Sequence, residues 1–405
     1  MHAPQRKLFY GFRAPAALLI ASLLWVAGCE DNDDSEPATG QDRGRIVSAE
    51  PLGPVSPALV EQLAQVSDFP IALNSAYTVA VYRVVYRTVD AHGTACDASG
   101  AAFLPLGAPA APLISLQHGT ETKRDAVASA MPVYYGLDAL AMASEGFAAC
   151  SPDYLGFGVS TGIHPYLHAE ASAAAVVDFL RACRTLCGEK DQPLNGQVFL
   201  AGYSEGGFVT VAAQREIERH YAGEFQLAAV ASLSGPYDLP GIVRRVLGEP
   251  EGRDPYFVAY FVTAYNAIYG WNMLPEIFRD PYAGQVSALF DGTHTSDEVS
   301  AALPGSLDGL LWGGFIQGYL NGGEPVVEDA VRRNSLLGWK PLAPLRLYHG
   351  TADPIVPYEN AVTARDSFAA AGADVELVTL PGAGHESAIF DSIEPAHQWF
   401  AGLRR

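Results

Sequence analysis

Two kinds of hydrophobic pattern alternate along most of this chain. From residue 59 onward, short runs of apolar and β-branched residues alternate with longer segments in which apolar positions recur every three or four residues. The short runs predict strands, and the longer segments predict amphipathic helices. Strands that alternate with helices favour a mostly parallel sheet with helices on both faces, so the expected fold class is α/β.

The expected elements can be placed along the chain, and no internal repeat interrupts them. Strands are predicted over residues 77–89, 94–104, 113–117, 147–151, 198–201, 228–233, 345–348 and 375–379, the first two as an antiparallel pair. Helices are predicted over residues 169–182, 205–221 and 358–371. We therefore expect a single domain over residues 59–405.

One segment of that domain, residues 236–341, lacks the pattern of a buried strand. It is rich in aromatic residues, and those between Tyr256 and Trp271 recur at a spacing near three and four, which predicts an amphipathic helix. We interpret the segment as a mainly helical cap inserted over one edge of the sheet. Its rings are suited either to a substrate pocket or to the insertion's own core, and both interpretations stay open.

The first 28 residues have the features of a signal peptide. Positive charges at Arg6, Lys7 and Arg13 precede an apolar run over residues 14–27, which is too short for a convincing membrane span. The run ends in VAGC, which resembles a bacterial lipobox with Cys29 as the lipidated residue. The alternative is an ordinary signal peptide that happens to contain a cysteine.

The residues after Cys29 are polar and acidic, and they predict a solvated tether over residues 29–58. Acyl chains on Cys29 would hold the protein on a membrane surface without spanning it. We therefore expect an exported protein of the bacterial cell envelope, lipid-anchored on the periplasmic or outer-membrane side.

Four further cysteines are free to pair in an oxidising compartment. Cys183 and Cys187 are four residues apart near the end of a helical pattern, so one turn would bring them together, and we favour that disulfide. Cys96 and Cys150 would then form the remaining pair. A metal site is the rival explanation, but no CxxC pair or histidine spacing supports one.

Composition limits the choice of partners. The 405 residues carry a formal net charge of −20, and 49% of them are hydrophobic, which is typical of a globular chain. A phosphate backbone would repel so acidic a protein, so nucleic acid is not an expected partner. The sequence gives no indication of the oligomeric state.

The strongest chemical signal is Ser204 in the string GYSEG. An apolar run leads into the string and a helical pattern leaves it, so the serine is expected on a tight turn between a strand and a helix. Side chains at Gly202 and Gly206 would collide with the neighbouring backbone in such a turn, and the helix N-terminus favours a developing anion. We therefore expect a nucleophile here rather than a plain glycine-rich connection.

A serine nucleophile needs a base, and the base needs a group that orients it. His385 in PGAGHE and Asp353 in HGTADPIVP each follow a predicted strand, and loops after parallel strands meet at one edge of the sheet. The chain order of serine, aspartate and histidine agrees with this type of site. Asp238 is an alternative acid, and His118 and His349 are alternative bases.

The site also needs two N–H donors for the oxygen of a tetrahedral intermediate. Glu205, the residue after the serine, is expected to supply one of them. The other is expected from QHGT, which follows a predicted strand, with Thr120 as the first choice and Gly119 as the second.

Two further strings are expected near the same edge. PDYLGFG, residues 152–158, follows a predicted strand, and its glycines indicate an unusual backbone path that shapes the pocket. His164, Pro165 and Tyr166 either line the entrance or belong to a surface loop.

The strings LQHGT, PDYLGFG, GYSEGG, LSGPYDL, HGTADPIVP and PGAGHE, in this order, resemble the secretory lipase and esterase branch of the α/β-hydrolase superfamily, from about residue 77 to the C-terminus. The resemblance implies an α/β-hydrolase fold, ester hydrolysis through an acyl-serine and no cofactor. It gives Ser204, Asp353 and His385 the roles of nucleophile, acid and base. Glu205 departs from the family pattern, and its charge is expected to disfavour acidic substrates.

We therefore expect a lipid-anchored serine esterase or lipase that acts on a small-molecule or lipid ester. A serine peptidase on the same fold is the first alternative, but it would need a side-chain pocket and a charged anchor that we cannot locate. A non-catalytic binding lipoprotein is the second alternative, and the complete set of serine, aspartate and histidine argues against it.

Overall fold

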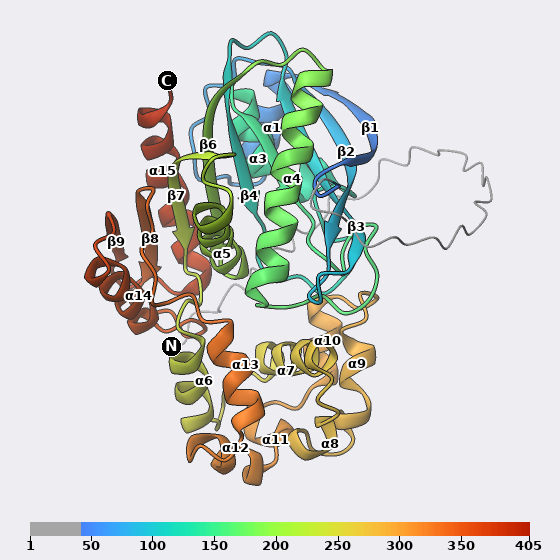
Figure 1. The fold of residues 1–405 in the computed structure, drawn as a ribbon, viewed down its shortest axis with the longest axis vertical. Coiled ribbons are helices and arrows are strands. Elements are labelled where there is room, and N and C mark those ends of the chain that lie inside the picture. The colour runs from blue at the N-terminus through green and yellow to red at the C-terminus, as the bar shows by residue number, and fades with distance from the viewer. Residues whose placement is uncertain (1–41) are drawn as a thin grey trace, which may run out of the picture.

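A nine-stranded sheet runs through the molecule in the order β1-β2-β3-β5-β4-β6-β7-β8-β9 (Figure 1). The computed structural model describes residues 42–405, so the predicted signal peptide and Cys29 lie outside the described residues. The strands from β5 to β9 are parallel, and β1, β2 and β3 join them through antiparallel pairs. The predicted α/β class is confirmed. The strands are β1 (Ile46–Val55), β2 (Val79–Val89), β3 (Ala95–Pro105), β4 (Ala111–Gln117), β5 (Ala148–Pro152), β6 (Leu194–Tyr203), β7 (Gln226–Leu233), β8 (Leu345–Gly350) and β9 (Val375–Leu380).

Helices cover both faces of this sheet, and each face has its own hydrophobic core. Along β6, Val198 and Leu200 belong to one core cluster while Phe199 and Ala201 belong to the other, as expected for side chains that alternate across a buried strand. One face is covered by α4 (Ala169–Glu189), α5 (Glu205–His220) and α14 (Tyr358–Ala370), and the other by α1 (Pro57–Val66), α3 (Leu137–Ser144) and α15 (His385–Leu403). A short helix, α2 (Pro132–Tyr135), precedes α3.

The chain between β7 and β8 forms a helical cap that gathers at one end of the sheet (Figure 1). Many of its aromatic side chains are buried in a core that the cap shares with one face of the sheet, and Tyr260, Tyr265 and Tyr319 are each at most 2% exposed. Its helices are α6 (Leu239–Gly248), α7 (Tyr256–Tyr269), α8 (Leu274–Ile277), α9 (Val286–Leu289), α10 (Ser296–Ala302), α11 (Leu307–Leu310), α12 (Gly313–Leu320) and α13 (Pro325–Arg333), with a 3₁₀ turn, η1 (Tyr282–Gly284).

The structure corrects the boundary of the predicted tether over residues 29–58. Strand β1 lies inside that segment and pairs with β2, and Nε of Arg43 contacts Oδ2 of the buried Asp178 at 3.0 Å. Strand β1 carries Pro51 and Pro54, which obscured its pattern, but an edge strand tolerates proline because one side makes no ladder hydrogen bonds. The folded domain therefore begins before residue 59.

The predicted disulfides are wrong, because Cys96, Cys150, Cys183 and Cys187 are all free thiols. Cys183 and Cys187 lie one turn apart on α4, where Cβ atoms are about 5–6 Å apart, whereas a disulfide needs about 3.5–4.5 Å. Cys150 lies opposite Ala102 in the register of β3 and β5, and Cys96 is six residues further along β3. Neither pair can therefore be bridged without moving the backbone.

In the part of the chain that the structure describes, no helix combines the length and the apolar character needed to cross a membrane.

Candidate active site

Ser204 occupies a sharp turn between β6 and α5. Its backbone has φ 57° and ψ −119°, a left-handed conformation that costs a non-glycine residue free energy and that clusters at functional sites. Space is equally tight around it, because a Cβ atom on Gly202 would lie 2.4 Å from the carbonyl oxygen of Gly206. One on Gly206 would lie 2.0 Å from the carbonyl oxygen of Gln117. The two glycines therefore allow the turn that presents the serine hydroxyl.

His385 and Asp353 meet Ser204 in one hydrogen-bonded chain. The Oγ atom of Ser204 lies 2.9 Å from Nε2 of His385, and Nδ1 of His385 lies 2.6 Å from Oδ2 of Asp353. The three residues are between 6% and 9% exposed. The residues that the sequence singled out separately thus converge at the carboxyl ends of β6, β8 and β9.

The carboxylate of Asp353 is held ionised. Its Oδ1 atom accepts the backbone N–H groups of Ile355 and Val356, both at 2.9 Å. Burial would raise the pKa of Asp353, but hydrogen bonds from His349 and His385 outweigh burial and lower the pKa to about 2. His349, one of the alternative bases, is therefore a partner of the acid and does not face the serine.

Backbone contacts fix the two loops that carry the acid and the base. The N–H of Ala352 donates to the carbonyl oxygen of Ala383 at 3.0 Å, which joins the loop after β8 to the loop after β9. Tyr203, next to the serine, donates its hydroxyl to the carbonyl oxygen of His385 at 2.8 Å. Sequence analysis found no separate signal for this tyrosine, which connects the nucleophile's strand to the base.

The other alternative acid and base have structural roles. Asp238 caps the N-terminus of α6, where its side chain accepts the N–H of Gly241 at 3.1 Å. The ring nitrogens of His118 lie 2.8 Å from the carbonyl oxygen of Gly119 and 3.1 Å from that of Asp153, and its ring stacks on Tyr154. Neither residue belongs to the chain of hydrogen bonds that reaches the serine.

The residues proposed for the oxyanion hole flank the serine. Glu205 is the first residue of α5, where backbone N–H groups have no partner within the helix. Gly119 and Thr120 follow β4, and an added Cβ on Gly119 would lie 3.9 Å from the Cβ of Ser204. Among residues 42–405, the backbone N–H groups of Thr120 and Glu205 donate to no backbone carbonyl. Both donors remain available for a substrate oxygen.

The side chains of these two residues are held by a segment that sequence analysis left undecided between an entrance and a surface loop. Nε2 of His164 lies 2.6 Å from Oε1 of Glu205, and Oη of Tyr166 lies 3.0 Å from Oγ1 of Thr120. His164 and Tyr166 are 2% and 5% exposed, so the surface-loop interpretation is wrong.

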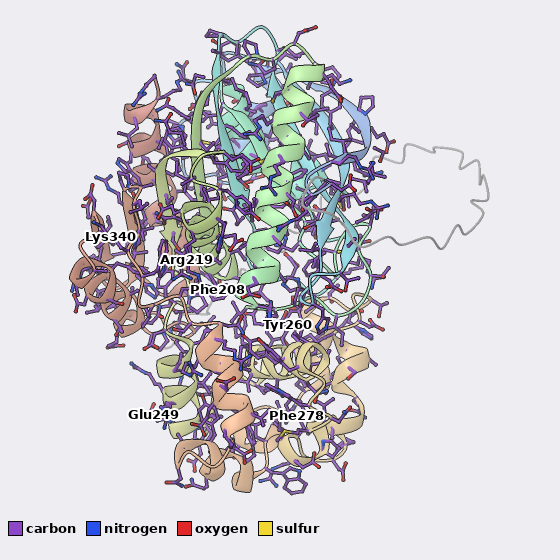
Figure 2. The ribbon with its side chains drawn as sticks, viewed as in Figure 1. Phe208, Arg219, Glu249, Tyr260, Phe278 and Lys340 are labelled. Atoms are coloured by element: carbon purple, nitrogen blue, oxygen red, sulfur yellow. The ribbon has the colours of Figure 1, made fainter. Side chains whose placement is uncertain are left out.

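The cap is attached to the loop that follows β4. Tyr260, on α7, donates its hydroxyl to the carbonyl oxygen of Glu121 at 3.1 Å, and its position at the junction of cap and sheet is visible in Figure 2. Thr122 donates to the carbonyl oxygen of His294 at 2.9 Å, and Nη2 of Arg124 donates to that of Asp291 at 2.7 Å. Cap and candidate oxyanion loop are thus parts of one packed unit.

A cavity of about 300 Å³ opens onto Ser204 and His385. It passes beneath Tyr256 and Phe257 of the cap and continues between α3 and α15 over the strands β4 and β6. Its lining is mostly apolar and includes Ile114, Leu116, Leu137, Ala141, Met142, Ile389, Ile393, Ala396 and Phe400. Such a cavity suits an apolar group joined to the reacting carbonyl.

Three carboxyl groups interrupt this apolar lining, those of Glu121, Asp138 and Glu386. Burial raises the pKa of Glu121 to about 8, and the nearby Glu205 carboxylate adds to the rise. Burial also raises the pKa of Asp138. Glu121 is therefore largely protonated at neutral pH and adds little negative charge to the cavity.

Comparison with known proteins agrees with this geometry. The sequence model of the alpha/beta hydrolase family matches residues 118–401, which include all three residues of the hydrogen-bonded chain. This chain belongs to the alpha/beta hydrolase family. No protein with a curated description matches it.

Solved structures resemble this alpha/beta hydrolase over most of its length. The rice cell wall degrading esterase LipA from Xanthomonas oryzae is 29% identical, with a TM-score of 0.76 over 88% of this chain and 95% of that one. A predicted hydrolase from Legionella pneumophila is also 29% identical, with a TM-score of 0.82 over 88% and 98% of the two chains. Lipase A from Candida antarctica, in its closed state, is 17% identical with a TM-score of 0.68 over 92% and 86%, and so shares the fold.

Proposed function

We propose that this alpha/beta hydrolase is a serine esterase or lipase that cleaves carboxylic esters through an acyl-serine intermediate. The observation that carries the proposal is the 2.9 Å contact between Oγ of Ser204 and Nε2 of His385 at the mouth of an apolar cavity. The esterase LipA, similar over most of both chains, supports the choice of ester over other acyl compounds.

The reaction follows from the contacts. Nε2 of His385 takes the serine proton as Oγ attacks the ester carbonyl, and Asp353 stabilises the resulting imidazolium through Nδ1. The N–H groups of Thr120 and Glu205 bind the tetrahedral oxygen. His385 then protonates the leaving alcohol, and the acyl group stays on Ser204. In the second half of the reaction a water molecule gives a proton to His385 and attacks the acyl carbon. The bond to Oγ then breaks, and His385 returns the proton to Ser204 as the acid leaves.

The apolar cavity supports an uncharged acyl or alkyl group as the part of the substrate nearest the serine. Because the cavity follows α15 from His385 to Phe400, it offers room for a chain rather than for a compact ring alone. The mostly apolar lining favours an ester with an apolar acyl or alkyl group over the peptidase alternative.

The test is hydrolysis of p-nitrophenyl esters of graded chain length by the wild-type protein and Ser204→Ala. The wild type is expected to hydrolyse the esters, and Ser204→Ala to lose about 10⁶-fold in kcat. Cleavage of aminoacyl amides in preference to esters would assign the site to a peptidase. Failure of a fluorophosphonate to label the wild-type serine would favour a binding protein.

We also propose that the chain is exported and anchored to a membrane surface through lipid on Cys29. The support is the VAGC string at the end of a signal-like segment. In a bacterial host, wild-type protein is expected in the membrane fraction and Cys29→Ser in the soluble envelope fraction. An unchanged distribution would reject the anchor.

A further inference from the structure

Glu205, directly after the candidate nucleophile, is one of the most buried charged residues of the site. It is 1% exposed, and its Oε1 atom lies 2.6 Å from Nε2 of His164, which is 2% exposed. The other ring nitrogen of His164, Nδ1, lies 2.7 Å from the carbonyl oxygen of Leu155. These two contacts determine how many protons the pair holds.

A carbonyl oxygen only accepts hydrogen bonds, so Nδ1 of His164 carries a hydrogen. A neutral imidazole would then have a bare Nε2, which would oppose a carboxylate oxygen at 2.6 Å without a proton between them. The pair therefore holds one proton in addition to the hydrogen on Nδ1 of His164. It exists either as imidazolium and carboxylate or as neutral imidazole and carboxylic acid. Both forms are neutral overall, so the pair as a whole adds no net charge to the hole.

Stability does not account for this pair. The Oε2 atom of Glu205 is buried and makes no hydrogen bond within the described part of the chain, and such an unsatisfied oxygen costs free energy. Replacing a buried ion pair with apolar residues of similar volume is often neutral or stabilising. A role in the reaction is the better explanation for a buried glutamate beside the nucleophile.

Tyr166, two residues after His164, contacts the other residue proposed for the hole. Its hydroxyl lies 3.0 Å from Oγ1 of Thr120, and its ring stacks on Tyr260 of the cap at a centroid distance of 4.5 Å. The segment between the two side chains is short, and Pro165 fixes its own φ angle. One three-residue segment thus contacts both residues proposed to supply the oxyanion donors.

We propose that His164 and Tyr166 are positioning residues that set the geometry of the oxyanion hole. His164 holds Glu205 and Tyr166 holds Thr120, so that both backbone N–H groups point to the same oxygen. This proposal rests on the proposed ester hydrolysis. Because the donors act on the charge that develops in the transition state, loosening them lowers kcat and leaves KM nearly unchanged.

The experiment compares His164→Phe, Tyr166→Phe, Glu205→Leu and Glu205→Gln with the wild type. Each is assayed for kcat and KM on a p-nitrophenyl ester and for the rate at which a fluorophosphonate labels Ser204. Labelling forms a bond between Oγ and phosphorus and expels fluoride, and it places a phosphonyl oxygen in the hole. His164→Phe and Tyr166→Phe are expected to lose about 10- to 100-fold in kcat and in labelling rate, less than the loss of a whole donor.

Glu205→Gln provides the conservative comparison. Its amide can donate to the bare Nε2 of neutral His164 while Nδ1 still donates to Leu155, so it is expected to retain about tenfold more kcat than Glu205→Leu. The matched control is Tyr86→Phe, which removes a buried hydroxyl that donates to the carbonyl oxygen of Ala175 at 2.8 Å, between β2 and α4. This control is expected to keep wild-type kcat.

The combined variant His164→Phe with Glu205→Leu separates positioning from folding. It is expected to melt no lower than the wild type and still to show the loss in kcat. Wild-type labelling rates in both His164→Phe and Tyr166→Phe, or a loss confined to KM, would overturn the proposal. If His164→Phe does not fold, the kcat and the labelling rate of Tyr166→Phe alone test the proposal. A wild-type protein that neither labels nor hydrolyses esters would instead reject the proposed function.

Discussion

Nε2 of His349 lies 3.4 Å from Oδ2 of Asp353, the same carboxylate oxygen that Nδ1 of His385 contacts at 2.6 Å. Two imidazoles therefore face one carboxylate oxygen, while Nε2 of His349 also lies 2.8 Å from the carbonyl oxygen of Val356. Of the two, only His385 reaches the serine. Because the folded pKa of Asp353, about 2, lies below its ordinary 3.8, the carboxylate stabilises the folded protein above pH 3.8. That stabilisation is lost as the pH falls through about 2.

Asp353→Asn tests the role of this shared acceptor. Asparagine fits the same space but cannot compensate an imidazolium, and its amide favours the wrong tautomer of His385. The expected loss in kcat is about 10⁴-fold, measured on a p-nitrophenyl ester at neutral pH. Circular dichroism and thermal melting check that the variant is folded. A kcat within tenfold of wild type would show that Asp353 does not serve the base.

Glu121→Gln tests the carboxyl group that titrates inside the cavity. Since burial raises its pKa to about 8, Glu121 gains a negative charge beside the developing oxyanion above that pH. Wild-type kcat is therefore expected to fall above about pH 8, while Glu121→Gln keeps its activity there. The titratable groups that interact electrostatically with Glu121 include Glu205, Tyr135, Tyr256 and Tyr260, and all four are unchanged in the variant.

The same substitution has a consequence for stability. The folded pKa of Glu121 is above its ordinary 4.5, so its favourable contribution is complete below pH 4.5 and is lost as the pH rises through about 8. Denaturant unfolding at pH 5 and pH 9 is expected to show Glu121→Gln gaining stability relative to wild type at the higher pH. Parallel pH profiles of the two proteins would contradict the titration of Glu121.

Ala396→Phe tests whether the cavity holds a chain. Ala396 lines the cavity on α15, eleven residues from His385, which is about 16 Å along a helix. A phenyl ring there is expected to lower kcat/KM for long-chain esters about tenfold or more and to leave an acetate ester unaffected. Ala401→Phe, on an exposed position of the same helix, is the matched control. An equal effect on short and long esters would show that this part of the cavity does not bind the chain of the substrate.

Gly206→Ala tests the crowding around the nucleophile turn. The added methyl group would lie 2.0 Å from the carbonyl oxygen of Gln117, and backbone on both sides must shift to admit it. The free energy of unfolding is expected to fall by about 1–3 kcal/mol, measured with urea, together with a loss of ester hydrolysis. Gly223→Ala is the control, because its Cβ would meet no heavy atom within 4 Å.

Much of this fold could be predicted because its signals are local. The apolar runs gave β4 to β9 and their order along the chain, and GYSEG, HGTADP and PGAGHE each stand directly after a strand. Parallel strands bring such loops to one edge, so the meeting of Ser204, Asp353 and His385 required no knowledge of long-range packing. Helix α15 was not predicted, since Pro395 in its interior interrupts the helical pattern.

The contacts around the oxyanion hole could not be predicted, because they join residues whose local patterns are ambiguous. His164 and Glu205 are 41 positions apart, and the residues around each of them give no indication that the two side chains are in contact. A charged residue after the nucleophile could have prompted a search for a buried partner, since a buried charge is rarely left unpaired. The disulfide prediction failed for a different reason, because residues one turn apart on a helix have Cβ atoms too far apart for a disulfide.

His385, which contacts Ser204 across 181 positions, is the first residue of helix α15. A ribosome completes the nucleophile turn and the whole cap before it makes the base, and the same helix walls the cavity. A prematurely ended polypeptide would thus carry an intact serine elbow with neither a proton acceptor nor a closed cavity. Hydrolytic competence in this way waits until His385 and the rest of α15 have been translated.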